Sequence, residues 1–202
     1  DGIASVIPFA LSSGMIGNLF THSDIGGYTS LHGNIRTKEL FDRWLEMNVF
    51  SCYMRTHEGN RPTQNFQFYH DEDTLRLMKR MTEIRVLLKP YIKYLFEEAI
   101  QKGYPVQRPY FMHYEHDLET YDLQYEYLFG EDILIKPVVL PDKVGQELYL
   151  PDDDWIHLWT GTSYQGKSQV IVPSPIGYPP VFYRKHSKFA KLFQSITDKY
   201  HL

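Results

Sequence analysis

The spacing of apolar and polar positions divides the chain into two parts. Up to about residue 102, helical patterns alternate with short apolar runs. Residues 5–15 are apolar at nearly every position, which predicts a buried helix, and residues 37–48 have the spacing of a helix. Residues 18–22 and 49–54 are short runs typical of strands, the second β-branched and aromatic. This alternation predicts parallel βα units, as in an α/β sheet or barrel.

Local signals place the ends of the predicted helices. Thr37 is a suitable N-cap for the helix that follows it. A longer helical pattern runs over residues 71–102, with apolar side chains three or four positions apart. Pro90 is expected to kink this helix and Gly103 to end it.

After residue 104 the pattern becomes that of an all-β domain. Short runs rich in Tyr, Val, Ile and Phe are separated by Gly, Pro and Asp turns, which predicts an antiparallel β-sandwich. Residues 187–199 then form an amphipathic helix. The expected strands are Arg108–His116, Gln124–Phe129, Ile133–Val139, Glu147–Leu150, Ile156–Trp159, Gln169–Val172 and Val181–Arg184.

Composition narrows the possible functions. The chain has 202 residues, of which 43% are hydrophobic, enough for a sizeable core. A net charge of −4 without a basic stripe argues against nucleic-acid binding. No apolar run is long enough to cross a membrane. The single cysteine, Cys52, is expected to be a small buried hydrophobe, in keeping with a reducing, cytoplasmic location.

Two polar clusters each follow a predicted strand of the first part. HSDIGGY occupies residues 22–28, and RTHEGNRP occupies residues 55–62. Ligands bind at the carboxyl ends of parallel strands, so the two clusters are expected to meet at one crevice. Carboxylate, imidazole, guanidinium and phenol groups together suit a polyhydroxylated substrate, since each hydroxyl needs a fixed partner.

Each feature also has a purely structural interpretation. Gly26 and Gly27 can simply make a turn, and Asp24 can cap it. His22 is more readily a satisfied, partly buried histidine than a catalytic base. For His57, which opens a polar loop, the two interpretations are balanced.

The second part offers less chemistry. Its aromatic residues are expected to be core rather than a platform for sugars. Residues 152–154, three consecutive aspartates, are expected to form an exposed turn rather than a calcium site. His113 and His116 would face opposite sides of a strand. We therefore expect neither a metal site nor a cofactor.

Five motifs in this order carry a resemblance to a known family. They are HSDIGGY, ELFDRWLEMNVFSCYMRTHEGNRP, PVQRPYFMHYE, QYEYLFGEDILIKPV and PPVFYR. Together they resemble glycoside hydrolase family 31, and within it the bacterial sulfoquinovosidases, over essentially the whole chain. The resemblance implies that residues 1–103 are the last part of a (β/α)8 TIM barrel, with strands seven and eight. Residues 104–202 would be the β-sandwich with a terminal helix.

The resemblance assigns substrate-binding roles and no catalytic residue. His57 matches the family's histidine that binds sugar hydroxyls, and Arg55 matches the arginine that helps hold the nucleophile ionised. Asp24 matches the aspartate of the D-I-G-G signature, which orients the site. Both catalytic carboxylates of this retaining family lie upstream of HSDIGGY, before residue 1. Asp24 with Glu58 would be a forced substitute pair.

Tyr28 indicates the substrate. Family α-glucosidases typically have Phe here, whereas in sulfoquinovosidases a Tyr helps to hold the sulfonate. A buried hydroxyl left unpaired by a neutral hexose costs about 1–3 kcal/mol, while a sulfonate gives it a charged partner. The sequence therefore favours α-sulfoquinovosides. An α-glucosidase for neutral sugars is the runner-up, and a non-catalytic carbohydrate-binding or structural module is a third possibility.

Too few βα units are present for a closed barrel, which needs eight. The chain begins with Asp-Gly-Ile, and we expect it to have been cut from something longer. The remaining barrel segment of the parent protein is therefore an expected partner, alongside the carbohydrate. On its own, the chain is expected to be inactive.

Overall fold

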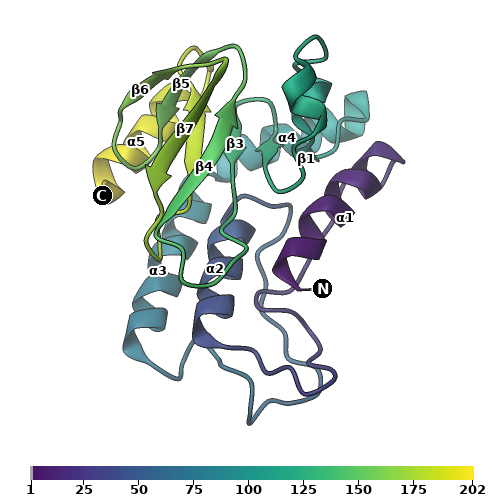
Figure 1. The fold of residues 1–202 in the computed structure, drawn as a ribbon, viewed down its shortest axis with the longest axis vertical. Helices are drawn as coiled ribbons and strands as arrows, with labels where there is room; N and C mark the ends of the chain where they lie inside the picture. Colours follow the sequence, from purple (N-terminus) through teal and green to yellow (C-terminus); the bar gives the residue numbers. More distant parts are fainter. Residues whose placement is uncertain (1) are drawn as a thin grey trace.

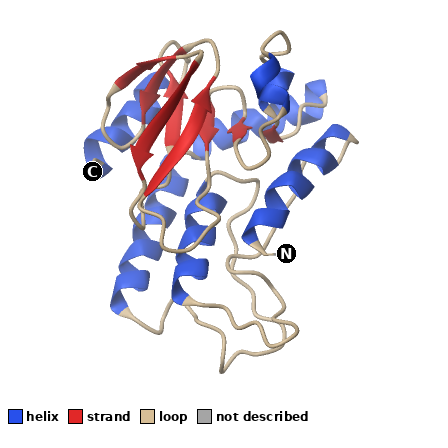
Figure 2. Cartoon of the chain, viewed as in Figure 1, coloured by secondary structure: helices blue, strands red, loops and turns tan. Residues whose placement is uncertain are grey.

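The computed structural model describes residues 2–202, in which helices and irregular loops precede a compact sheet region (Figures 1 and 2). The helices are α1 (Ile3–Met15), α2 (Lys38–Val49), α3 (Glu72–Leu87), α4 (Lys89–Lys102) and α5 (Ala190–Tyr200). The strands are β1 (Gln107–Arg108), β2 (Tyr127–Phe129), β3 (Ile133–Ile135), β4 (Gly145–Leu150), β5 (Asp154–His157), β6 (Ser163–Gln165), β7 (Ser168–Pro173) and β8 (Val181–Arg184). Short 3₁₀ helices cover Tyr110–Met112 and Leu118–Tyr121.

The predicted helix ends agree with the structure in most places. Thr37 caps α2, since its side chain accepts a hydrogen bond from the Leu40 N–H at 3.2 Å. Gly103 ends α4 in the left-handed conformation, with φ of 74°. The pattern over residues 71–102 forms two helices instead of one kinked helix. Pro90 lies in the first turn of α4, where its missing N–H removes no helical hydrogen bond.

The antiparallel sandwich predicted for the second part is present. One sheet has the order β1-β2-β3-β8-β5-β6, and a second sheet pairs β4 with β7. All the pairings are antiparallel. In Figure 1 the β4–β7 ribbon lies in front of the larger sheet, and α5 lies behind it.

The two faces of the larger sheet belong to two different cores. In β3, Ile133 and Ile135 join the core formed with the helices, whereas Leu134 joins the core shared with β4 and β7. In the same way, β8 directs Tyr183 to the helices and Phe182 to the smaller sheet. This period of two, with both faces covered, explains why the strands are apolar at successive positions.

The two strands predicted in the first part are not formed. Helix α2 continues through Val49, and residues 50–54 and 18–22 are irregular. The two segments do lie side by side: Cys52 Sγ is 3.9 Å from the Leu19 carbonyl, and just beyond the segments the Ile25 N–H donates to the Arg55 carbonyl at 2.9 Å. A parallel strand needs a continuous ladder with its neighbours, and one backbone bond does not make a ladder.

A third predicted strand is much shorter than expected. Only Gln107 and Arg108 pair with β2, so the strand expected over Arg108–His116 is wrong beyond its first residue. Pro109 follows, and the chain turns into the first 3₁₀ helix. Proline cannot donate to a ladder, which gives the physical reason for the early end.

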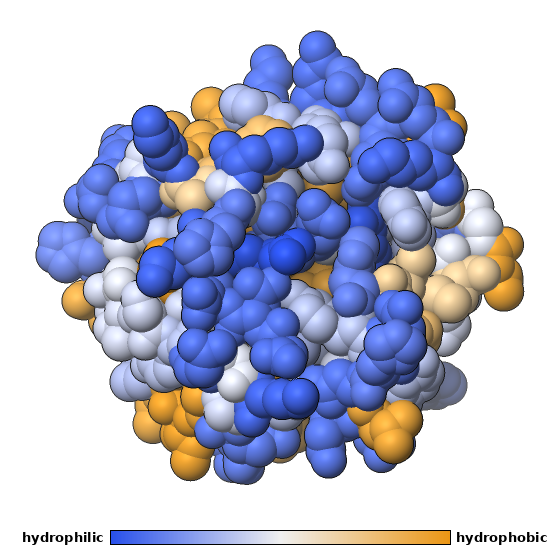
Figure 3. All heavy atoms as spheres, turned by 90° about the horizontal axis from the view of Figure 1, so that it is seen from above, coloured by the Kyte–Doolittle hydropathy of each residue, from blue (hydrophilic) through white to orange (hydrophobic). Residues whose placement is uncertain are grey.

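The surface over the sheet end of the molecule is mainly hydrophilic. Figure 3 shows this end from above, with separate apolar areas at its margins. Helix α1 differs, because Phe9 and Met15, and Ile16 directly after the helix, are each more than half exposed. No helix in residues 2–202 combines the length and apolar character that a membrane crossing requires.

Helix α2 buries two carboxyl groups that do not belong to the candidate site. Asp42 is 2% exposed, and its Oδ1 has no hydrogen-bond partner within the described residues. Burial raises the pKa of Asp42 to about 6. Burial likewise raises the pKa of Glu46 to about 7, although Arg43 and the Gly177 N–H both favour its charged form.

Asp42→Asn is expected to stabilise the protein at neutral pH. The unfolded carboxyl ionises near pH 3.8 and the folded one near 6, so a penalty grows as pH rises through this interval. At about 1.4 kcal/mol per pH unit, removing the charge raises the free energy of unfolding by roughly 2–3 kcal/mol above pH 6, and changes it little near pH 3.5. Thermal unfolding midpoints at pH 4.0 and 7.5 test this, with Asp73→Asn on the exposed face of α3 as control. A lower midpoint for Asp42→Asn at pH 7.5 would contradict it.

Candidate functional site

The candidate site lies on two neighbouring loops below α1 and α2 in Figure 1. The first loop follows Asp24 and runs to Arg36, and the second covers residues 56–70. Backbone bonds join them, including one from the Gly59 N–H to the Tyr28 carbonyl at 2.9 Å. Further along the loops, Asn60 Nδ2 donates to the Ser30 carbonyl at 2.8 Å.

Asp24 is held as a carboxylate by two neighbours. Its Oδ1 lies 2.9 Å from both Arg55 Nε and His22 Nε2. Burial favours a higher pKa for Asp24, but the hydrogen bonds from Arg55 and His22 outweigh burial and lower the pKa below its ordinary value. Asp24 and Arg55, both expected at the site from sequence, therefore form one ion pair.

Helix α2 fixes the backbone that presents Asp24. The Trp44 indole N–H donates to Ser23 Oγ at 2.9 Å, and Asn48 Nδ2 donates to the Ser23 carbonyl at 2.7 Å. The helix is itself fixed by its Thr37 cap and its buried apolar face. The position of Asp24 thus depends on Trp44 and Asn48, which lie in the second half of α2.

The second pair of expected residues also meets. The rings of Tyr28 and His57 are 4.8 Å apart between centroids and are inclined by 64°, an edge-on contact. Gly26 and Gly27 bring Tyr28 back toward this position, with φ of +80° and +82°. A Cβ at residue 26 would lie 2.2 Å from Arg36 Cδ, so this position requires glycine for space as well as for conformation.

Gly59 provides the space in which Tyr28 lies. A Cβ at this position would lie 2.7 Å from Tyr28 Cε1 and 2.8 Å from Tyr28 Cζ. The Tyr28 ring therefore packs directly against the backbone of the second loop, while about half of its surface stays exposed.

The sequence did not predict that Arg36 and Glu58 hold the two loops of the site together. Arg36 is buried, and its Nη2 lies 2.9 Å from Glu58 Oε2. Glu58 was considered only as a possible partner of Asp24. Because Arg36 binds Glu58 and Arg55 binds Asp24, each carboxylate has its own cation, which argues against using them as a catalytic pair.

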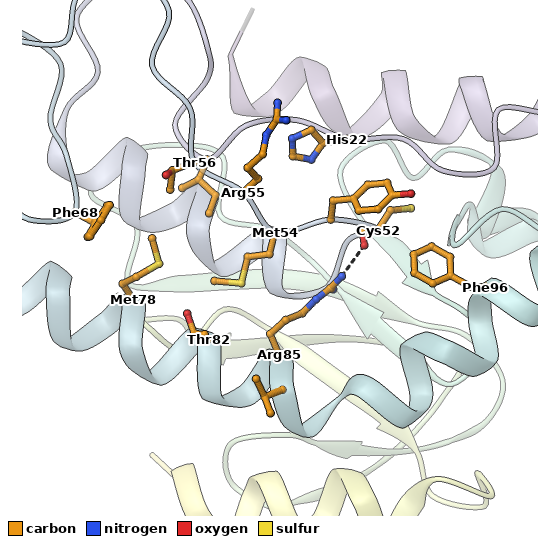
Figure 4. Close-up of a pocket in the computed structure, with 13 residues that line it drawn as sticks. His22, Cys52, Met54, Arg55, Thr56, Phe68, Met78, Thr82, Arg85 and Phe96 are labelled. Atoms are coloured by element: carbon orange, nitrogen blue, oxygen red, sulfur yellow. Dashed lines mark hydrogen bonds between the residues drawn. The ribbon is translucent and has the colours of Figure 1, made fainter.

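A hollow of about 930 Å³ lies beside the second loop (Figure 4). Arg55 and His22 lie at one end of it, and apolar side chains such as Met54 and Phe96 line its length. Opposite them, Arg85 donates to the Cys52 carbonyl. Asp24, Tyr28 and His57 do not line this hollow, so it is a separate feature from the contact between Tyr28 and His57.

Neither a metal centre nor a reactive thiol is indicated. Within residues 2–202, no three His, Cys, Asp or Glu side chains are grouped so that they could hold a metal ion. Cys52 is 1% exposed, and burial raises the pKa of its thiol to about 12, so it stays protonated. The prediction that Cys52 is a buried hydrophobe is confirmed.

Comparison with known families assigns both halves of the chain. Residues 1–95 match the TIM-barrel domain of the glycosyl hydrolases family 31, and residues 103–187 match the C-terminal domain of the same family. The chain belongs to glycoside hydrolase family 31. The predicted fold class, the last part of a (β/α)8 barrel followed by a β-sandwich, is confirmed. The boundary near residue 103 stays a prediction.

Relatives within the family are similar over nearly the whole chain. A sulfoquinovosidase of Agrobacterium fabrum is 50% identical over 97% of this chain, and alpha-glucosidase 2 of Bacillus thermoamyloliquefaciens is 31% identical over 91%. A solved family 31 sulfoquinovosidase from E. rectale, in complex with the aza-sugar inhibitor IFGSQ, is 57% identical over 100% of this chain, with a TM-score of 0.97.

The chain spans only part of these relatives. It covers 30% of the Agrobacterium protein, 23% of the Bacillus protein and 30% of the E. rectale chain. An activity that belongs to a whole relative therefore comes to this chain only as a proposal.

Gly59→Ala is expected to displace the Tyr28 ring from His57. The added methyl group would overlap the ring and the Tyr28 carbonyl, and overpacking of this kind costs about 1–3 kcal/mol. A crystal structure of the variant tests the displacement, and thermal unfolding tests the cost. Gly145→Ala is the matched control, since its new Cβ would meet only the Val172 carbonyl, at 3.6 Å. An unmoved Tyr28 ring in Gly59→Ala would contradict the expectation.

Proposed function

We propose that the protein containing this chain is a retaining α-glycoside hydrolase that acts on α-sulfoquinovosides. The observation that carries the proposal is the contact between Tyr28 and His57 at 4.8 Å, next to the ion pair of Asp24 and Arg55. Identity of 50% to a sulfoquinovosidase supports the choice of substrate. The chain supplies part of the rim of the sugar site.

Each rim residue has a chemical task in this proposal. The His57 imidazole binds sugar hydroxyls, since it can donate from one nitrogen and accept at the other. Asp24 stays ionised and fixes the direction of the Arg55 guanidinium. That guanidinium, whose side chain is 59% exposed, is free on its outer side to help hold a carboxylate of the catalytic pair in its ionised form.

The catalytic carboxylates themselves would come from the preceding polypeptide. Retaining chemistry needs a nucleophile and an acid/base roughly 5–5.5 Å apart, flanking the glycosidic bond. Asp24 and Glu58 are each bound by an arginine, and neither has the raised pKa that a general acid requires. No catalytic residue is therefore proposed within this chain.

Tyr28 distinguishes between an anionic and a neutral sugar. Its ring packs on Gly59 and against His57, and the side chain is about half exposed, so a ligand can reach the phenol. A sulfonate oxygen would accept a charge-assisted hydrogen bond from the hydroxyl, and a neutral hexose offers no charged acceptor. An α-glucosidase remains the second candidate, because the Bacillus α-glucosidase is 31% identical over 91% of the chain.

The rest of the barrel has a place to pack. The hollow of about 930 Å³ runs along residues 52–56, where a strand of a complete barrel would have a neighbour. Its lining includes Met54, Met78 and Phe96, which suit contact with another apolar surface. The exposed apolar side chains of α1 provide a second such surface. We propose that the upstream barrel segment of the parent protein covers both.

We also propose the cytoplasmic location that the sequence predicts. Cys52 is a free thiol. Reducing compartments keep such thiols unpaired, which supports the proposal.

The parent protein is expected to hydrolyse para-nitrophenyl α-sulfoquinovoside in preference to the α-glucoside. Tyr28→Phe removes one hydrogen bond to a charged group, worth about 1.5–3 kcal/mol, and should lower kcat/KM for the sulfoquinovoside roughly tenfold to a hundredfold. The value for the glucoside should change little. Steady-state kinetics with both substrates test this, and a wild-type preference for the glucoside would refute the assignment.

The 202-residue chain alone is expected to show no glycosidase turnover and poor solubility. The exposed Tyr53 and the exposed apolar side chains Phe9 and Met15 of α1 would stay uncovered, which favours aggregation. Purification of the chain alone, and of the chain co-expressed with the upstream barrel segment, tests this. Turnover by the isolated chain would contradict the proposal that the catalytic acids lie upstream.

A further inference from the structure

The Glu58 carboxylate accepts hydrogen bonds from four residues of the second loop. Its Oε1 accepts from the N–H groups of Asn60 and Arg61, at 3.3 and 3.1 Å. Asn65 Nδ2 lies 3.1 Å from both carboxylate oxygens, and Gln67 Nε2 lies 3.3 Å from Oε2. The side chain is 12% exposed. Hydrogen bonds to this one carboxylate therefore fix the conformation of residues 60–67.

Arg36 connects the Glu58 carboxylate to the first loop. Besides Glu58, its guanidinium binds the Gly27 carbonyl through Nη1 at 3.0 Å and the Phe66 carbonyl through Nε at 2.8 Å. The side chain is only 2% exposed, so water does not replace these partners. Arg36 thus bridges the two loops, because its acceptors come from both.

Arg36 contacts the residues that directly adjoin His57 and Tyr28 in the chain. Glu58 follows His57 directly in the chain, and the Gly27 carbonyl is in the peptide bond to Tyr28. One connection between the His57 and Tyr28 backbones therefore passes through this side-chain ion pair. The bond from the Gly59 N–H to the Tyr28 carbonyl runs parallel to it.

We infer that Arg36 and Glu58 are positioning residues that set the distance between Tyr28 and His57, and with it the preference for an anionic sugar. This inference rests on the function proposed above. Neither side chain needs to touch the substrate. A hydroxyl binds a sulfonate well only within a narrow range of distance and angle, so a small shift of one loop weakens that bond. A neutral sugar offers this hydroxyl no charged acceptor, so the same shift of Tyr28 costs the neutral sugar less.

The test measures the ratio of kcat/KM for the sulfoquinovoside to kcat/KM for the glucoside, rather than either activity alone. Glu58→Gln keeps the shape of the side chain, but in either orientation its amide nitrogen would face donors, those of Arg36 and Gln67 or the N–H groups of Asn60 and Arg61. Arg36→Lys keeps the charge, but an ammonium lacks the fork of guanidinium donors that reaches Glu58 and the carbonyls of Gly27 and Phe66. Both variants are made in the full-length parent protein, and kcat/KM is measured for the sulfoquinovoside and the glucoside on the same preparation. The ratio is then independent of the folded fraction.

Each variant is expected to lower the ratio of sulfoquinovoside to glucoside about tenfold, close to the effect of Tyr28→Phe. Combining Glu58→Gln with Tyr28→Phe should lower the ratio no further than Tyr28→Phe alone, since both act on one hydrogen bond. Glu98→Gln is the matched control. Glu98 pairs with the buried Arg108 away from the two loops, so its loss should leave the ratio within about twofold of the wild type.

The possible outcomes separate this inference from the proposed function. A wild-type protein that prefers the glucoside overturns the proposed function. If the wild type prefers the sulfoquinovoside and both variants keep its ratio, the proposed function stands and the positioning role is wrong. An equal change in Glu98→Gln would show a general effect of breaking a buried ion pair, and would also overturn the inference. If Glu58→Gln yields no soluble protein, Arg36→Lys decides by the same ratio.

Discussion

The candidate site depends on the burial of one guanidinium. Arg36 is almost fully removed from water, and a buried charge without partners costs several kcal/mol. The two loops can be close together only in an arrangement that gives Arg36 its acceptors, which include Glu58 and the carbonyls of Gly27 and Phe66. Because these acceptors come from both loops, satisfying one side chain also fixes the relative position of Tyr28 and His57.

Charge balance at the rim follows from the same pairing. Asp24 and Glu58 are both ionised, since the surrounding donors keep their pKa values below the ordinary range despite burial. Left unpaired, two carboxylates would repel a sulfonate. Each is instead compensated by its own arginine, and the Arg55 side chain is 59% exposed. Under the proposed function, the rim would therefore present hydrogen-bonding groups to an anionic sugar without an opposing charge from these residues.

Sequence reasoning succeeded where the signal was local and failed where it was not. The Thr37 cap, the end of α4 at Gly103 and the strand Val181–Arg184 all depend on residues within a few positions of each other. The meeting of the two polar clusters was predictable because both follow neighbouring segments. The bond between Arg36 and Glu58 joins positions 22 apart on different loops, and no spacing rule identifies it. Parallel strands over 18–22 and 49–54 were expected, but the described residues contain no continuous ladder to form them.

Residues 49–52, shortly before Arg55, keep their position without a strand ladder, because side chains of other elements donate hydrogen bonds to their carbonyls. Arg85 of α3 donates to the carbonyls of Val49, Ser51 and Cys52, at 2.6–2.8 Å. From the sandwich, the Tyr127 hydroxyl donates to the Phe50 carbonyl at 2.9 Å. These donors satisfy carbonyls that would otherwise be buried without partners. The sandwich and α3 therefore brace the segment that carries Arg55 and His57, which explains why the barrel part and the sandwich share one core.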